Sequence, residues 1–193
     1  RNMPEEWARK NMGGVVGVRL IKELRGIPCI PMKDPLEVKK MIATTRMFGK
    51  PAFTLDEIKE AVATYVSRAA EKLRRQHHAA GFLQVFVVTN GRRDEKYLYN
   101  PQSRYQYTRL PKATSDTAQL IQHALPLAEK LFEPGLKYLK AGVILGELVP
   151  DNSIQADLFT ADSQQQHRPL MEAIDNINFS QRNDIIKYAA SGL

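Results

Sequence analysis

Residues 41–73, MIATTRMFGKPAFTLDEIKEAVATYVSRAAEKL, decide the fold of this 193-residue chain. The first eight residues are mostly apolar or β-branched, which predicts a strand, and Gly49 and Pro51 predict a break after it. A helix is expected to follow Thr54, because Glu57 stands three residues later, at the spacing of a capping box. Apolar residues then recur at steps of three and four, so one helix face must pack on a sheet. The residues of this face are Leu55, Ile58, Val62, Tyr65, Val66, Ala69 and Leu73.

The remaining elements predict an α+β fold. An apolar strand is expected over 82–89, and the Asn-Gly pair in 90–94 predicts a turn. An alternating strand is expected over 103–110, a second helix over 116–132, and a fourth strand over 139–148. The order strand–helix–strand–strand–helix–strand is typical of the ferredoxin-like, split βαβ (βαββαβ) fold, a four-stranded sheet with two helices on one face. The other face of the sheet is then open.

Other segments flank this expected domain, which spans 39–149. Residues 1–30 predict short helices around a Gly-Gly break, and 31–38, in a proline-rich stretch, predict a linker. Residues 150–168 are polar, acidic and Gln-rich, which is typical of a flexible segment. Residues 169–193 predict a short helix, a polar turn and a final strand.

The net charge of +7 is unevenly distributed: +3 over 1–30, +8 over 31–115 and −4 over 116–193. A basic middle segment indicates a polyanionic partner, although an ordinary solvated surface has the same composition. No apolar run has the length of a membrane span, and no signal-peptide pattern opens the chain. The single cysteine, Cys29, is compatible with a reducing cytoplasm. Because the chain starts with Arg1 rather than methionine, we expect it to be part of a longer protein.

Basic residues near the open face are candidates for neutralising phosphate groups. They are Arg46, Arg104 or Arg109, Lys112 and Lys140. Strict alternation along 103–110 separates Arg104 from Arg109, which shares a face with Tyr105 and Tyr107. These tyrosines could stack on bases as in RNA-recognition sheets, although the aromatic motif of such sheets is absent and tyrosines at strand spacing are also common in cores.

Two large apolar residues lie within the acidic segment, in Gln155-Ala156-Asp157-Leu158-Phe159. Exposed apolar side chains in a polar segment need a partner, because exposure costs solubility without forming a core. Leu158 and Phe159 would enter an apolar pocket, and Gln155 would form hydrogen bonds at its edge.

Several of these stretches resemble UmuC-type Y-family DNA polymerases. Thr45-Arg46-Met47-Phe48-Gly49 is similar to the Ser-Arg-Ser-Phe-Gly motif at the start of their little-finger domain, with two serines replaced. Residues 23–29 (ELRGIPC) match the segment that leaves the thumb domain, and 65–74 and 170–178 match later parts of the family. Gln155, Leu158 and Phe159 resemble the motif with which bacterial polymerases bind the β sliding clamp.

This resemblance implies what each part of the chain does. Residues 1–30 would end the thumb, 39–149 would form the DNA-binding little finger, 150–168 would bind the clamp, and 169–193 would begin the UmuC-type C-terminal region. The strands would lie across the major groove and grip both DNA backbones near the primer terminus. The matching DNA-binding positions are Thr45, Arg46, Arg104, Arg109, Lys112 and Lys140.

The expected function is therefore DNA gripping and clamp tethering within an error-prone translesion polymerase of DNA repair and the SOS response, located in the cytoplasm at the nucleoid. Implied partners are primer-template DNA, the β sliding clamp, a UmuD-type dimer and RecA. The palm carboxylates that hold Mg²⁺ for phosphoryl transfer are expected to precede Arg1. The fragment is thus expected to bind without catalysing, with no catalytic, metal or cofactor residue of its own. The alternative is a ferredoxin-like module that binds protein and not nucleic acid.

Overall fold

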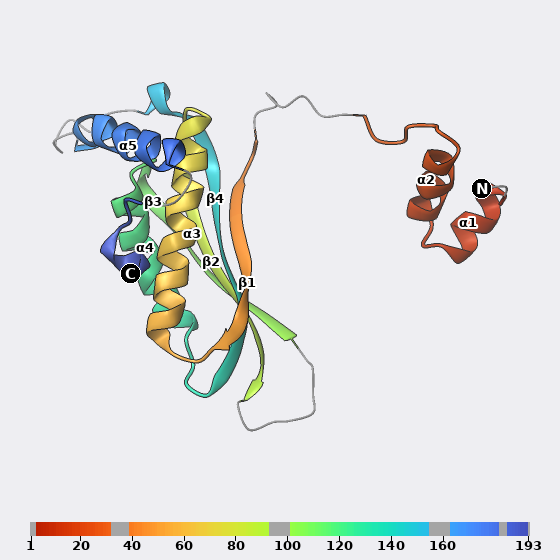
Figure 1. Cartoon of the computed structure of the whole chain (residues 1–193), viewed down its shortest axis with the longest axis horizontal. Helices are drawn as coiled ribbons and strands as arrows, with labels where there is room; N and C mark the ends of the chain where they lie inside the picture. The colour runs from red at the N-terminus through yellow and green to blue at the C-terminus, as the bar shows by residue number, and fades with distance from the viewer. Residues whose placement is uncertain (1–2, 32–38, 93–100, 155–162, 182–184, 193) are drawn as a thin grey trace. The chain divides into compact units, whose positions relative to one another are not determined.

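The computed structural model describes residues 3–31, 39–92, 101–154, 163–181 and 185–192. They belong to two compact units, Arg1–Val38 and Lys39–Leu193 (Figure 1). In the first unit, α1 (Glu5–Asn11) and α2 (Val15–Leu24) are joined by a turn in which Gly13 and Gly14 have positive φ. The predicted helical pair with its Gly-Gly break is confirmed.

The second unit contains the predicted βαββαβ order. Each pair of neighbouring strands in its sheet is antiparallel, and the strand order is β1-β4-β2-β3. Strand β4 lies between β1 and β2, and β2 lies between β3 and β4, so each strand–helix–strand unit is split by a strand of the other. The elements are β1 (Ile42–Ala52), α3 (Leu55–Arg75), β2 (His78–Arg92), β3 (Pro101–Thr114), α4 (Thr117–Leu131) and β4 (Leu136–Pro150).

Helices α3 and α4 contact each other and lie on the same face of the sheet, as predicted (Figure 1). Their apolar sides and the inner sides of β2 and β4 form one core of buried side chains. Burying a side chain of this size contributes about 1.5–3 kcal/mol. The largest fully buried aliphatic side chains of this core are Ile58, Val62, Val66, Leu73, Leu83, Val85, Val87, Leu120, Val143 and Leu145.

The capping box at the start of α3 is confirmed. The amide of Glu57 donates to Oγ1 of Thr54 at 3.3 Å, and Oε2 of Glu57 accepts the amides of Phe53 and Thr54, each at 2.9 Å. These backbone hydrogen bonds stabilise the carboxylate and hold the pKa of Glu57 below its ordinary value. The helix therefore begins where the sequence predicts.

The predicted bounds of two strands, β1 and β2, are wrong. Strand β1 continues through Gly49 and Pro51 to Ala52, with a shift of register after Met47. Proline is tolerated there because β1 is an edge strand and the ladder is already irregular. Strand β2 begins at His78, before the predicted start at residue 82, and extends to Arg92, so it includes residues of the predicted turn over 90–94.

The segment after the sheet contains η1 (Asp151–Ser153), α5 (Ser163–Ser180) and η2 (Ala189–Ser191). Helix α5 begins within the range 150–168, which was expected to be a linker. The final strand predicted near the end is wrong, because residues 185–192 form η2 and irregular backbone that packs on α3. The side-chain amide of Asn178 forms two hydrogen bonds of 2.9 Å with the backbone of Ile186 and so takes the place of a neighbouring strand.

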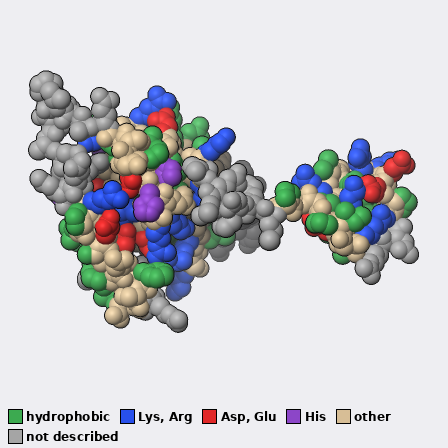
Figure 2. Space-filling model, turned by 90° about the horizontal axis from the view of Figure 1, so that it is seen from above, with side chains coloured by type: hydrophobic (Ala, Val, Ile, Leu, Met, Phe, Trp, Pro, Cys, Tyr) green, Lys and Arg blue, Asp and Glu red, His purple; other side chains and the backbone are tan. Residues whose placement is uncertain are grey.

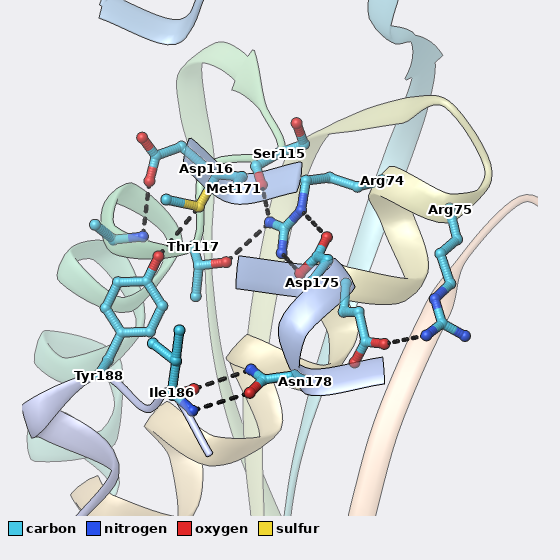
Figure 3. Close-up of polar contacts among 12 residues, drawn as sticks. Arg74, Arg75, Ser115, Asp116, Thr117, Met171, Asp175, Asn178, Ile186 and Tyr188 are labelled. Carbon is cyan, nitrogen blue, oxygen red and sulfur yellow. Dashed lines mark hydrogen bonds and ion pairs between the residues drawn. The ribbon is translucent and has the colours of Figure 1, made fainter. Parts of the chain in front are cut away.

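Arg74 joins three elements of this unit (Figure 3). Its Nε and Nη2 donate to the two carboxylate oxygens of Asp175 on α5, both at 2.7 Å, and the Arg74 side chain is only 11% exposed. Its Nη1 donates to the carbonyl of Ser115 at 2.7 Å and to Oγ1 of Thr117 at 2.9 Å. The guanidinium thus binds α5 to the end of α3 and the start of α4.

Weaker polar contacts surround this arginine. Nδ1 of His167 lies 2.8 Å from Oδ2 of Asp116, and the hydroxyl of Tyr188 lies 3.1 Å from the sulfur of Met171. Burial raises the pKa of the Tyr188 phenol, so it remains neutral near neutral pH. Viewed from above, the unit shows histidine, basic and acidic side chains gathered close together (Figure 2).

The Arg74→Ala variant is expected to lower the free energy of unfolding by about 3 kcal/mol, because the change leaves the largely buried Asp175 without its partner. Arg75→Ala is the matched control, since the neighbouring Arg75 is 50% exposed and its ion pair with Glu71 contributes less than about 1 kcal/mol. Urea unfolding followed by circular dichroism measures both values. Equal effects of the two variants would contradict the role assigned to Arg74.

Candidate nucleic-acid interface on the open face of the sheet

The register assigns the side chains of the strands to two faces, because directly paired residues point to the same side of a sheet. One row crosses all four strands on the face that the helices cover: Arg46, Ala141, Val87 and Arg104. The next row lies on the open face: Thr45, Gly142, Phe86 and Tyr105. Consecutive residues of the sequence therefore face different surroundings.

Three of the predicted DNA-binding residues lie on the open face of the sheet. They are Thr45 on β1, Lys140 on β4 and Arg109 on β3. The Arg109 side chain is 79% exposed. Nζ of Lys140 lies 5.8 Å from the centre of the Phe86 ring, at the outer limit of a cation–π contact. This face thus presents a hydroxyl and two cations to solvent.

Arg46 and Arg104 belong to the opposite face. Arg104 forms an ion pair with Glu133, which follows α4. Arg46 lies near Tyr65 of α3: burial raises the pKa of that phenol, and the positive charge of Arg46 opposes the rise. Both arginines lie on edge strands, and the contact of each with DNA stays a prediction.

Lys112 lies apart from both rows. Residues 110–113 of β3 lie opposite the single residue Gly81, so the alternation of β3 is interrupted before Lys112. Lys112 lines a cavity of about 540 Å³ beside α5, together with His167, Arg168 and Asp175. Its contact with DNA also stays a prediction.

The predicted clamp-binding residues are not placed by the structure. Gln155, Leu158 and Phe159 lie outside the described residues, which stop at Ile154 and resume at Ser163.

The sequence interpretation missed an aromatic layer on the open face, because it treated 82–89 only as an apolar strand. Phe86 lies against Gly142, where an added Cβ would be 2.5 Å from two atoms of its ring. Phe82 lies against Gly146, where an added Cβ would be 3.2 Å from the Phe82 ring. The signal in the sequence is a matched spacing: two phenylalanines four residues apart on one strand and two glycines four residues apart on its partner.

One carboxylate also lies at this face. Oε1 of Glu147 is 3.0 Å from Nη2 of Arg109, and both side chains are at least half exposed. An exposed ion pair of this kind contributes about 0–1 kcal/mol. A phosphate group could therefore replace Glu147 as the partner of Arg109 at little cost.

The described residues contain no group of three or more His, Cys, Asp or Glu side chains that could hold a metal ion. None of the helices in the described ranges is long and apolar enough to cross a membrane. The side chains described on the open face are mainly basic, aromatic and small polar ones.

Residues 39–158 match the sequence profile of the impB/mucB/samB family C-terminal domain. The chain therefore belongs to this family, and this region is the little-finger domain of UmuC-type Y-family polymerases. The resemblance predicted from the sequence is confirmed.

Individual relatives match nearly the whole chain. It is 31% identical over 189 residues to Protein UmuC of Salmonella typhimurium. The aligned region covers 97% of this chain and 44% of that protein. It is 32% identical over 183 residues to Protein MucB of Escherichia coli, and the aligned region covers 93% of this chain and 42% of that protein. It is 30% identical over 178 residues to Protein ImpB of Salmonella typhimurium, covering 92% and 41%. The chain thus spans less than half the length of these relatives.

The Gly142→Ala variant is expected to lower the free energy of unfolding by about 1–3 kcal/mol, because the new methyl group would overlap the Phe86 ring and Thr45. Gly49→Ala is the control on the edge strand β1, where an added Cβ meets no atom within 4 Å among the described residues. Its expected change is below about 0.5 kcal/mol. Thermal unfolding compares the two, and an unchanged stability of Gly142→Ala would mean that Phe86 does not lie over this glycine.

Proposed function

We propose that the open face of the sheet binds the sugar–phosphate backbone of primer-template DNA. The observation that carries this proposal is the presence of Thr45, Arg109 and Lys140 on one exposed face of a little-finger domain. Lysine and arginine neutralise phosphates, and the threonine hydroxyl can donate a hydrogen bond to a phosphate oxygen. Contacts of this kind hold DNA without reading its sequence, which suits a polymerase that must accept any template.

The spacing of the two cations fits a duplex. Arg109 is paired with Phe82 of β2, and Lys140 is paired with Val88, six residues further along β2. At about 3.3 Å per residue the two cations are separated by roughly 20 Å along the strands. This separation exceeds the width of the major groove, about 12 Å, so each cation would reach the backbone on a different side of it.

The whole protein would be an error-prone translesion DNA polymerase of DNA repair and the SOS response, acting in the cytoplasm. Its palm domain, with the carboxylates that hold Mg²⁺, would belong to the part of the relatives that this chain does not span. The present chain would then hold the substrate while the palm carries out phosphoryl transfer. A UmuD-type dimer and RecA are the further partners that membership of this family suggests.

Replacing Arg109 and Lys140 together with alanine is expected to weaken binding to a fluorescent primer-template duplex. The slope of log K against log salt concentration is about −0.9 per phosphate contact, so the slope of the double variant should be less negative by nearly 2. Fluorescence anisotropy titrations at several salt concentrations measure both the affinity and the slope.

The matched control is the double variant Lys59→Ala and Arg75→Ala, which removes the same charge from helix α3 on the helix-covered side of the sheet. If this control loses as much of the slope as the open-face variant, DNA contacts both faces and the proposed surface is too small. If the unsubstituted chain binds no DNA even at low salt, the protein-interaction alternative is the better interpretation of the open sheet.

We further propose that residues 155–159 tether the polymerase to the β sliding clamp. The support comes from the sequence: Gln155, Leu158 and Phe159 have the spacing of the clamp motif, and they lie at the end of the region that matches the family. The two apolar side chains would occupy a pocket of the clamp, and Gln155 would form directional hydrogen bonds beside it.

Leu158→Ala together with Phe159→Ala is expected to raise the Kd for purified clamp at least about 30-fold, since the two anchor residues together are expected to contribute about 2 kcal/mol or more. Surface plasmon resonance with immobilised clamp gives the Kd. Asp157→Asn serves as the control, because the motif accepts an acidic or a polar residue there. Unchanged affinity of the double variant would rule out this motif as the tether.

A further inference from the structure

Tyr105 and Tyr107 project from the open face on edge strand β3, and each is 60% exposed. They are two residues apart, so their side chains share one face at a separation of about 7 Å. An aromatic ring has a large apolar area, and two neighbouring rings left in solvent indicate a binding surface.

The inner aromatic layer leaves these rings uncovered. Phe86 is paired with Tyr105 across the strands, but its ring lies over Gly142 of β4, on the side away from β3. Phe82 lies against Gly146 of β4 in the same way, with its ring centre 5.6 Å from that of Tyr107 at an interplanar angle of 31°. The two glycines thus allow the phenylalanines to lie toward β4, and the tyrosine rings form an outer layer.

Positive charge is placed next to the tyrosine pair. Arg109 follows Tyr107 by two residues on the same strand and face, and its side chain is 79% exposed. Its present partner, Glu147, is also exposed, so a phosphate can replace it. A single nucleic-acid strand combines flat bases with regularly spaced phosphates, and it therefore complements aromatic rings followed by a cation.

We propose that Tyr105 and Tyr107 stack on two successive bases of single-stranded DNA, with Arg109 bonded to a neighbouring phosphate. This inference rests on the proposed DNA-binding function and extends it from duplex to unpaired template. The bases of a duplex cannot serve, because each base is covered on both sides by its neighbours in the stack. The strand would run along edge strand β3, on the same face that contacts the duplex backbone, and Arg109 would be common to both binding modes.

The experiment compares two probes of equal length, a fluorescent 20-nucleotide oligo(dT) and a blunt 20-base-pair duplex. It uses the whole chain and two double variants: Tyr105→Leu with Tyr107→Leu, which removes the aromatic faces, and Tyr105→Phe with Tyr107→Phe, which keeps them. Stacking on one base contributes about 1–3 kcal/mol. The leucine variant is therefore expected to raise the Kd for oligo(dT) at least tenfold and the Kd for duplex less than threefold, whereas the phenylalanine variant should change both less than threefold.

The possible results distinguish the stacking inference from the proposed binding of duplex DNA. Unchanged binding of oligo(dT) by the leucine variant, an equal loss for both probes, or binding of duplex alone by the unsubstituted chain would overturn the stacking inference and leave duplex binding intact. Absence of binding to either probe at low salt would overturn both. Thermal unfolding of each variant shows that the sheet is preserved, which is expected because both side chains are exposed.

Discussion

The burial of one face of the central strands is the constraint on which the rest of this domain depends. Leu83, Val85, Val143 and Leu145 point toward α3 and α4, and each is fully buried. Because side chains alternate along a strand, this burial decides the orientation of all their neighbours. A register shift of one residue in β1 would exchange Thr45 with Arg46, and a shift in β3 would exchange Tyr105 with Arg104. The composition of the open face is thus a consequence of core packing on the neighbouring strands β2 and β4.

Strong local patterns made most of this architecture predictable. The three- and four-residue periodicity of α3, its capping box and the apolar run of β2 led to the right elements in the right order. Gly49 and Pro51 led to a predicted strand end that is too early, because an edge strand with an irregular ladder accommodates both residues. Whether a strand lies at an edge depends on the assembled sheet and is not visible in the local sequence. The predicted final strand failed for a related reason, since η2 packs on α3 and none of the strands in the described part of the chain pairs with residues 185–192.

The faces of the candidate site were harder to predict than the fold. Polar side chains occur on both sides of β3, where Arg104, Gln106 and Thr108 alternate with Tyr105, Tyr107 and Arg109. Alternation separates these two sets but does not say which set the helices cover, because an edge strand is only partly covered. The pairing of Val85 with Gln106 and of Val87 with Arg104 settles the matter, and it is visible only in the assembled sheet.

Helix α5 has a consequence for where this domain can be cut. The region that matches the family ends at residue 158, before α5 begins, and an expression boundary placed there would look natural from the sequence. Arg74 would remain with its hydrogen bonds to Ser115 and Thr117, but the carboxylate that balances its charge would be removed. The end of α3 would thus lose the two charge-assisted hydrogen bonds that join it to α5. A fragment that keeps this ion pair is therefore longer than the region that matches the family, and it extends at least through Asp175.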